Sequence, residues 1–239
     1  MDSSLDNART TGAGLVVAID GTSGSGKSST SRGVATRLGL RYLDTGAMFR
    51  AMTWWLLQAG VDVQDPAAVA ARCHEPDLVS GTDPAAPSIT VDGRDVGVEI
   101  RSAEVNAAVS PVSAVPEVRA RLLAMQREAI AGATSGPAGA GIVVEGRDIG
   151  SVVAPDAQVK VYLTADPAAR ADRRAAEEGG PGTSEALEAV RSSLLARDAI
   201  DSTRATAPLT MAEGAVHVDT TSSTLEEVVD RIAALAGTP

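Results

Sequence analysis

The sequence predicts an α/β fold in which a parallel five-stranded sheet is flanked by helices. Short apolar runs recur along the 239 residues, and each is continuous rather than alternating, as is typical of strands covered on both faces. Helical stretches separate these runs, which favours right-handed crossover connections between parallel strands. With 44% hydrophobic residues, the chain has enough apolar side chains for a proper core.

The expected strands are short. The first is the run Leu-Val-Val-Ala-Ile-Asp at 15–20. Similar runs stand at 141–145 and 159–163, a weaker one at 215–219, and a shorter candidate at 40–44. Their lengths are those of buried strands rather than helices.

The strand and helix rhythm breaks between residues 62 and 104. Four prolines interrupt this segment, and residues 88–96 alternate around Asp92-Gly93, which predicts a hairpin. We therefore expect a core comprising residues 15–61 and 105–237, with 62–104 as an insertion.

Composition indicates the surroundings of the protein. Residues 1–14 lack the basic start and apolar run of a signal peptide, so we expect a loose tail. No run approaches the roughly 18 apolar residues of a membrane-spanning helix. Cys73 is the only cysteine, which excludes an internal disulfide and suits a reducing compartment. The lack of a signal peptide and of a membrane-spanning run predicts a cytoplasmic protein. Because the net charge is −10, we expect binding to neither nucleic acid nor membranes.

A phosphate-binding motif follows the first expected strand and opens a helix. Residues 21–28 match G-x-x-x-x-G-K-S/T, whose glycines let backbone N–H groups converge at a helix N-terminus. Lys27 is expected to reach the β- and γ-phosphates of ATP, and the Ser28 hydroxyl to face Mg²⁺. The expected ATP-binding residues are Gly21, Thr22, Ser23, Gly24, Ser25, Gly26, Lys27, Ser28 and Ser29.

The phosphate-binding loop at 21–28, called the P-loop, occurs in several classes of protein. Two of these classes do not match this sequence. Lysine occurs only at positions 27 and 160, so the Asn-Lys-x-Asp segment of GTPases is absent. No expected strand ends in the acidic pair of motor and transporter ATPases. Arginine-bearing segments are instead spaced along the chain, as a site holding the charge of two nucleotides requires. This pattern favours a small-molecule kinase.

Three segments resemble the signature segments of bacterial cytidylate kinases. They are Asp-Thr-Gly-Ala-Met-Phe-Arg at 44–50, Gly-Arg-Asp-Ile-Gly at 146–150, and Arg197-Asp198 with Asp201 and Arg204. The resemblance extends from Leu15 to the end of the chain. The insertion resembles the enlarged monophosphate-binding subdomain of that family. Phe49 stands where this family often has Tyr, and Thr22 where many members have Pro.

The resemblance implies a P-loop kinase core that transfers the γ-phosphoryl of ATP to CMP or dCMP, giving ADP and CDP or dCDP. Three arginines could fork onto the acceptor phosphate, namely Arg50, Arg119 and Arg147. Asp201 could hold a sugar hydroxyl and Ser110 could read the cytosine edge. The implied acceptor-binding residues are Thr45, Gly46, Arg50, Ser110, Arg119, Arg147, Asp148, Asp201 and Arg204.

A short lid is expected at about 170–184. Arg170, Arg173 and Arg174 share one helical face by their spacing and precede a Gly-rich break at 179–182. On closing, such arginines would meet the charge of the transferring phosphoryl group and exclude water. The expected catalytic residues are Lys27, Arg147, Arg170, Arg174 and Arg197.

Alternatives remain at this point. The same core would suit uridylate, adenylate or shikimate kinase, or a nucleotide-dependent switch without rapid transfer. The lid arginines could also form a solvated, ion-paired helix face, and Arg197, Asp201 and Arg204 an ordinary salt-bridged helix. We expect a monomer that acts on small molecules.

Overall fold

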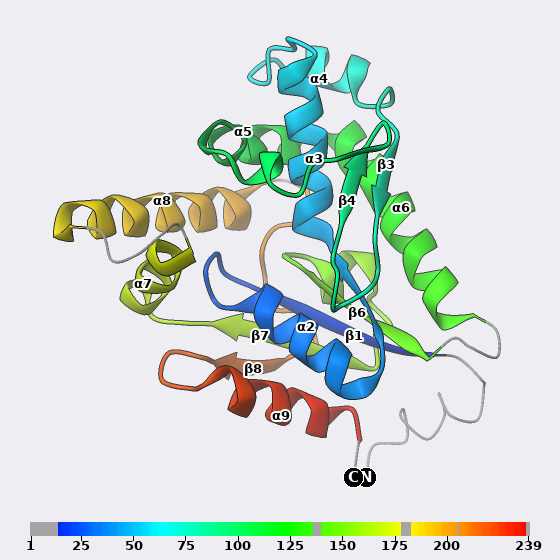
Figure 1. Ribbon diagram of the computed structural model, residues 1–239, viewed down its shortest axis with the longest axis vertical. Coiled ribbons are helices and arrows are strands. Elements are labelled where there is room, and N and C mark those ends of the chain that lie inside the picture. Colours follow the sequence, from blue (N-terminus) through cyan, green and yellow to red (C-terminus); the bar gives the residue numbers. More distant parts are fainter. Residues whose placement is uncertain (1–13, 136–139, 178–182, 205, 238–239) are drawn as a thin grey trace.

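The computed structural model describes residues 14–135, 140–177, 183–204 and 206–237. At its centre all strands of one five-stranded sheet run parallel, in the order β2-β6-β1-β7-β8 (Figure 1). The strands are β1 (Leu15–Gly21), β2 (Arg41–Asp44), β6 (Gly141–Gly146), β7 (Val159–Thr164) and β8 (Val216–Asp219). The predicted fold class and the predicted parallel sheet are confirmed.

Side chains of the central strand β1 alternate between two apolar clusters. Val16 and Ala18 point into one cluster, whereas Val17 and Ile19 point into the other. All four are buried, which explains why the strand has a continuous apolar run in the sequence. The sheet is therefore the middle layer of a three-layer molecule.

Helices cover both faces of the sheet (Figure 1). Helices α2 (Lys27–Leu38) and α9 (Leu225–Leu235) cover one face, and α3 (Thr45–Gln58) and α6 (Pro116–Thr134) the other. The glycine at position 33 lets α2 approach α9, because a Cβ there would lie 2.6 Å from Cγ2 of Val229. Helix α2 stops at Gly39, which is left-handed with φ 65° and donates its N–H to the carbonyl of Ala35.

The insertion contains the predicted hairpin. Asp92 and Gly93 adopt φ of 50° and 77°, as a tight turn between two antiparallel strands requires. Leu78 and Ile89 join the cluster that contains Val16, so the insertion packs on the main core. Its elements are α4 (Pro66–Arg72), β3 (Leu78–Ser80), β4 (Ile89–Val91), β5 (Arg94–Asp95) and the 3₁₀ turn η1 (Glu99–Arg101). Helix α5 (Ala103–Ala114) follows it, and the domain boundaries stay predictions.

Two helices overlap the expected lid at about 170–184. Helix α7 (Pro167–Glu177) contains the lid arginines, and α8 (Ser184–Thr203) follows. Residues 178–182 of the lid, and 1–13 of the expected tail, lie outside the described residues. Among the helices that the structure describes, none has the length and apolar character needed to cross a bilayer.

Candidate active site

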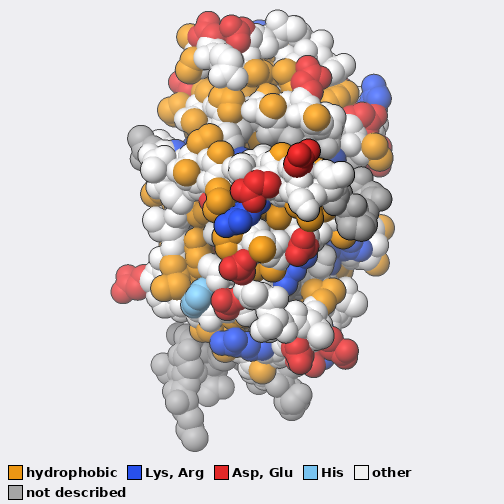
Figure 2. Space-filling model, turned by 90° about the vertical axis from the view of Figure 1, so that its left-hand side faces the viewer, with side chains coloured by type: hydrophobic (Ala, Val, Ile, Leu, Met, Phe, Trp, Pro, Cys, Tyr) orange, Lys and Arg blue, Asp and Glu red, His pale blue; other side chains and the backbone are white. Residues whose placement is uncertain are grey.

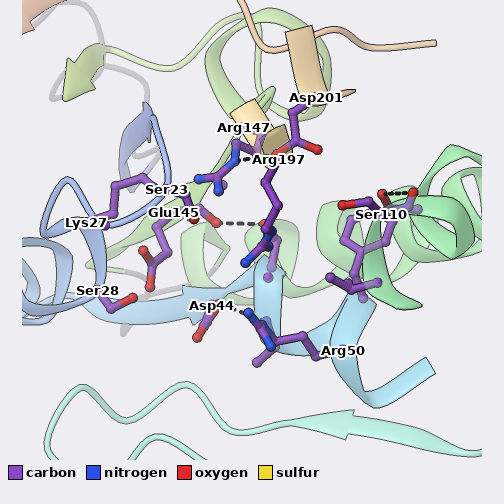
Figure 3. Close-up of a pocket in the computed structure, with 18 of the residues that line it drawn as sticks. Ser23, Lys27, Ser28, Asp44, Arg50, Ser110, Glu145, Arg147, Arg197 and Asp201 are labelled. Carbon is purple, nitrogen blue, oxygen red and sulfur yellow. Dashed lines mark hydrogen bonds and ion pairs between the residues drawn. The ribbon is translucent and has the colours of Figure 1, made fainter. Parts of the chain in front are cut away.

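A cavity of about 250 Å³ lies at the carboxyl ends of the central strands, where ligands of parallel α/β sheets bind. Its walls come from the loop after β1, the start of α3, α5, α6, the end of β6, α7 and α8. Figure 3 shows Lys27, Ser28 and Glu145 on one side of the cavity and Ser110 on the other, with arginines between them.

The P-loop forms the first wall. Gly24 and Gly26 have φ of 73° and 86°, a left-handed conformation that glycine adopts without steric cost. Gly26 precedes α2, and no side chain caps this helix N-terminus. The first N–H groups of α2 are therefore available to bind an anion in the cavity. The Lys27 ammonium donates to the carbonyl of Thr22 at 2.6 Å, within the same loop.

The Lys27 ammonium is buried close to acidic side chains, among them Glu145. Burial and the charge of Arg147 lower the pKa of Lys27, while Glu145 opposes that shift. Burial and the charge of Asp44 raise the pKa of Glu145, whose carboxylate accepts a hydrogen bond from the Tyr42 hydroxyl. A cation that is costly to bury alone thus has carboxylates nearby.

The start of α3 is placed against the end of β6. The Thr45 hydroxyl donates to the carbonyl of Glu145 at 2.7 Å. Gly146 permits this contact, because a Cβ there would lie 2.7 Å from Oγ1 of Thr45. The Asp44 carboxylate caps α3 by accepting from the N–H of Ala47 at 2.8 Å. Thr45 and Gly46 consequently reach the cavity wall.

Arg50 points into the cavity from the second turn of α3. Its guanidinium donates to the carbonyl of Ile100 at 3.1 Å and to Oδ1 of Asn106 at 2.6 Å. Burial, followed by the charges of Arg197 and Arg174, lowers the pKa of Arg50 to about 9. Three guanidinium groups from α3, α7 and α8 therefore repel one another in one space.

Arg119 and Asp148 form a buried ion pair at the opposite end. Arg119 also donates to the carbonyl of Ser113 at 3.1 Å, and its guanidinium lies 5.4 Å from the ring centre of Phe49. Arg204 lies 4.0 Å from the same Asp148 carboxylate. Burial raises the pKa of Asp148, and the charge of Arg119 opposes that shift. Arg119 is thus held on the cavity wall by Asp148 and by the carbonyl of Ser113, and its contact with the acceptor stays a prediction.

Asp20 fixes the segment that follows β6. Its two carboxylate oxygens accept from the N–H groups of Ile149 and Gly150, each at 2.8 Å. These residues open the π-helical turn η2 (Ile149–Val153), directly after Arg147 and Asp148. Burial raises the pKa of Asp20 to about 6, although the two N–H groups lower it. Asp20 therefore positions the segment that contains Arg147 and Asp148.

The structure brings most of the predicted residues together. Within the described residues, the buried Arg197 Nε and Arg204 Nη2 have no hydrogen-bond partner, which leaves donors for a ligand. The predicted residues on the cavity wall are Ser23, Gly24, Gly26, Lys27, Ser28, Ser29, Thr45, Gly46, Arg50, Ser110, Arg119, Arg147, Asp148, Arg174, Arg197, Asp201 and Arg204.

Arg170 departs from the expectation. Its side chain is 4% exposed, does not line the cavity, and pairs with Asp198 behind the P-loop. A contact with the transferring phosphoryl group has no support from this placement. Gly21, Thr22 and Ser25 belong to the loop but not to the cavity wall.

Sequence reasoning missed several residues. The sequence predicts Glu145 only as the end of a strand and Asp44 only as part of a signature segment, yet both line the cavity. Asn106, which orients Arg50, gave no signal in the sequence. An acidic residue at the end of a buried strand, next to Gly-Arg-Asp, was the signal available for Glu145.

Comparisons with known proteins show the family of this chain. The family model described as "Cytidylate kinase" matches residues 17–238. A cytidylate kinase of Streptomyces griseus is 53% identical over 98% of this chain and 96% of its own length. Those of Nocardia farcinica and Corynebacterium glutamicum are 53% and 46% identical, over 91% and 92% of this chain and 91% and 93% of theirs.

The match covers more than nine-tenths of the chain, from β1 to α9. It includes the P-loop, the three signature segments and every cavity wall described above. A solved gluconokinase from Sinorhizobium meliloti 1021 has a TM-score of 0.42 at 16% identity, covering 94% of this chain and 92% of its own. The chain belongs to the cytidylate kinase family.

Proposed function

We propose that this cavity holds both reactants of the cytidylate kinase reaction, with ATP at the P-loop end and CMP or dCMP at the arginine-rich end. The crowding of like charge carries the proposal. Burial, together with the charges of Arg197 and Arg174, lowers the pKa of Arg50. Buried cations in such proximity are costly unless a polyanion joins them. Two nucleotides would supply that charge.

Family membership gives the reaction: the γ-phosphoryl of ATP passes to CMP or dCMP, giving ADP and CDP or dCDP. Such a transfer depends mainly on alignment and on electrostatic stabilisation of charge spread over the phosphoryl oxygens. Lys27 is proposed to contact the β- and γ-phosphates. Arg174 and Arg197, on the cavity wall, are proposed to meet the charge of the transferred group.

The acceptor is proposed to lie between α3 and α8. Arg50 and Arg147 hold its phosphate, and Asp201 its sugar. Ser110, with Arg119, Asp148 and Arg204 beside it, faces the base. Because Arg119 already pairs with Asp148 and donates to the carbonyl of Ser113, it is proposed to contact the base rather than the acceptor phosphate.

Mg²⁺ is proposed to accompany ATP. The Ser28 hydroxyl and the Glu145 carboxylate line the cavity and offer the hard oxygen ligands that this ion prefers. Among the described residues, no three His, Cys, Asp or Glu side chains form a metal-holding group. Mg²⁺ usually keeps several waters and binds through one or two protein oxygens plus phosphates, so this donor set suits it. When bound, it neutralises charge on the β- and γ-phosphates.

The remaining partners stay predictions. On the face that carries α7 and α8, basic side chains are scattered among acidic ones (Figure 2). This distribution and the net charge of −10 support small-molecule substrates rather than nucleic acid. A monomer in the cytoplasm remains our expectation.

An ADP-release assay tests the proposal. CMP, dCMP, UMP, AMP and shikimate are offered as acceptors with ATP and Mg²⁺, and kcat/KM is compared. We expect CMP and dCMP to exceed the other acceptors. Equal or better turnover of AMP, UMP or shikimate would assign the cavity to another kinase of this core. Tight ATP binding without turnover of any acceptor would favour a nucleotide-dependent switch.

A further inference from the structure

Two arginines join the P-loop to helix α8. Arg147 donates to the carbonyl of Gly21 at 2.8 Å and to Oδ2 of Asp201 at 2.9 Å. Arg170 donates to the carbonyl of Ser23 at 3.0 Å and pairs with Asp198. Each arginine therefore holds one P-loop carbonyl and one α8 carboxylate.

Arg170 and Asp198 both hydrogen-bond to the backbone of Ser23. Oδ1 of Asp198 accepts from the N–H of Ser23 at 2.9 Å, while Arg170 takes the carbonyl of the same residue. The side chain of Arg170 is 5% exposed and that of Asp198 13%. A buried ion pair offsets its desolvation only when further hydrogen bonds engage both partners, as they do here.

Helix α7 packs closely against the P-loop. A Cβ at Gly24 would lie 3.2 Å from both Cβ and the carbonyl oxygen of Arg170. Arg173, one turn along the face, donates to Oγ1 of Thr220 at 2.9 Å, and that hydroxyl donates to the carbonyl of Ser25 at 3.0 Å. The loop thus cannot shift without moving the side chains that lead to α7 and α8.

Helix α8 also carries the acceptor end of the cavity. Asp198 lies next to Arg197, and Asp201 lies one turn further along, followed by Arg204. The donor loop and the acceptor helix are therefore parts of one hydrogen-bonded unit. A ligand that fixes either part lowers the cost of ordering the other.

We propose that the Arg170–Asp198 pair is a positioning pair that couples the two nucleotide sites, so that a nucleotide at the P-loop strengthens acceptor binding and the reverse. This rests on the proposed function, because it requires ATP and CMP to occupy the two ends. Arg170 acts through the loop and α8, not by touching a phosphate. Linkage makes the effect reciprocal, and typical coupling corresponds to roughly 5- to 150-fold changes in affinity.

Calorimetric titration of CMP, with and without a saturating non-hydrolysable ATP analogue and Mg²⁺, tests the coupling. For the wild type we expect the analogue to lower the Kd of CMP at least about fivefold. The coupling ratio is the Kd of CMP without the analogue divided by the Kd with it. In Asp198→Asn and in Arg170→Met this ratio is expected to fall to within about twofold of unity. The matched control is Arg191→Gln, also on α8, because Arg191 is exposed and pairs only with Glu188 at 3.5 Å among the described residues; its ratio should equal that of the wild type.

A double variant separates coupling from folding. Single substitutions leave a buried charge without its partner, so their thermal midpoints are expected to fall. Arg170→Met with Asp198→Leu removes both charges and should recover much of that loss. We expect its coupling ratio to stay near unity. If the double variant regained both the thermal midpoint and the coupling ratio of the wild type, the pair would have only a structural role and the inference would be overturned.

The outcomes for the wild type are also distinct. If it binds both ligands with a ratio near unity, the coupling inference fails and the proposed function stands. If CMP does not bind at all, the proposed function fails first, and the coupling inference with it. Unchanged ratios in both single variants would likewise overturn the coupling role.

Discussion

The proposed donor and acceptor ends of the cavity are built in different ways. The donor end comes from one continuous segment, the P-loop and the first residues of α2, and offers backbone N–H groups with Lys27. The acceptor end gathers side chains from α3, α5, α6, the end of β6 and α8, which are spread over residues 45–204. One end is local in the chain, and the other exists only once the chain has folded.

This difference affects how each end holds charge. At the donor end a glycine-rich backbone and a helix terminus supply a fixed positive potential. At the acceptor end Arg119 and Arg147 already hold Asp148 and Asp201 before a ligand arrives. We expect changes at the donor end to affect chemistry, and changes at the acceptor end to affect binding more strongly.

Lys27→Ala should have the largest effect. Loss of the ammonium at the β- and γ-phosphates is expected to lower kcat roughly 10²- to 10³-fold. The fold should survive, because burial already lowers the pKa of Lys27 and its charge is costly to keep. Steady-state kinetics and the thermal midpoint measure both effects.

The other lysine provides the control. Lys160 lies on β7 and contacts the carbonyl of Glu213 at 3.4 Å, outside the cavity. Lys160→Ala should turn over CMP as the wild type does. Near-normal kcat in Lys27→Ala would remove the donor end from the chemistry.

Asp20, near the end of β1, should make the free energy of unfolding depend on pH. Its folded-state pKa of about 6 exceeds the ordinary 3.8, so the folded protein binds this proton more tightly between these values. The free energy of unfolding should therefore fall as pH rises through this window, by up to about 3 kcal/mol, at about 1.4 kcal/mol per pKa unit.

Comparison with Asp20→Asn isolates this slope. The asparagine loses one of the two acceptors for Ile149 and Gly150, so its stability is lower at a given pH. Urea unfolding at pH 4.5 to 7.5 should nevertheless show a smaller fall with rising pH than in the wild type. Parallel curves for the two proteins would contradict the raised pKa of Asp20.

Arg147→Ala should weaken acceptor binding. Removal of a charged donor is expected to cost about 1.5–3 kcal/mol, so kcat/KM for CMP should fall roughly 10- to 150-fold. Because Arg147 also holds the carbonyl of Gly21, we expect a smaller rise in KM for ATP. The surface variant Arg37→Ala, which breaks an exposed pair with Asp230, is the control. An effect on ATP alone would contradict the assignment of Arg147 to the acceptor.

Ser110→Ala should have the smallest effect. Loss of one neutral hydroxyl near the proposed base site is expected to cost about 0.5–1.5 kcal/mol, a change of roughly 2- to 12-fold in KM for CMP. KM for ATP should not change, because Ser110 lies across the cavity from the P-loop (Figure 3). Equal changes for both substrates would indicate a general loss of structure.

Much of the donor end could be predicted from the sequence. The motif at 21–28 specifies local backbone conformation, and local conformation depends on glycine placement and the following helix. The acceptor residues were predicted from segments typical of a family, and their neighbours were not. Asn106 orients Arg50 and Glu145 faces Lys27 only because separate elements meet in space.

Arg170 and Arg174 show the same boundary within one helix. Their four-residue spacing placed both on one face of α7 and predicted one shared role. In the structure Arg174 lines the cavity, whereas Arg170 is buried against Asp198 and the carbonyl of Ser23. Spacing determines which residues share a helix face, but not what the two ends of that face meet.

The sequence alone determined the α/β class, the parallel strands, the phosphate loop and the hairpin within the insertion. These depend on short-range patterns of apolar residues, glycine and turn residues, which act over a few positions. Tertiary structure decided which charges pair, which are buried and which face the ligand space. It did so because ion pairing and desolvation depend on distances between side chains far apart in the chain, such as Arg147 with Asp201 and Arg170 with Asp198.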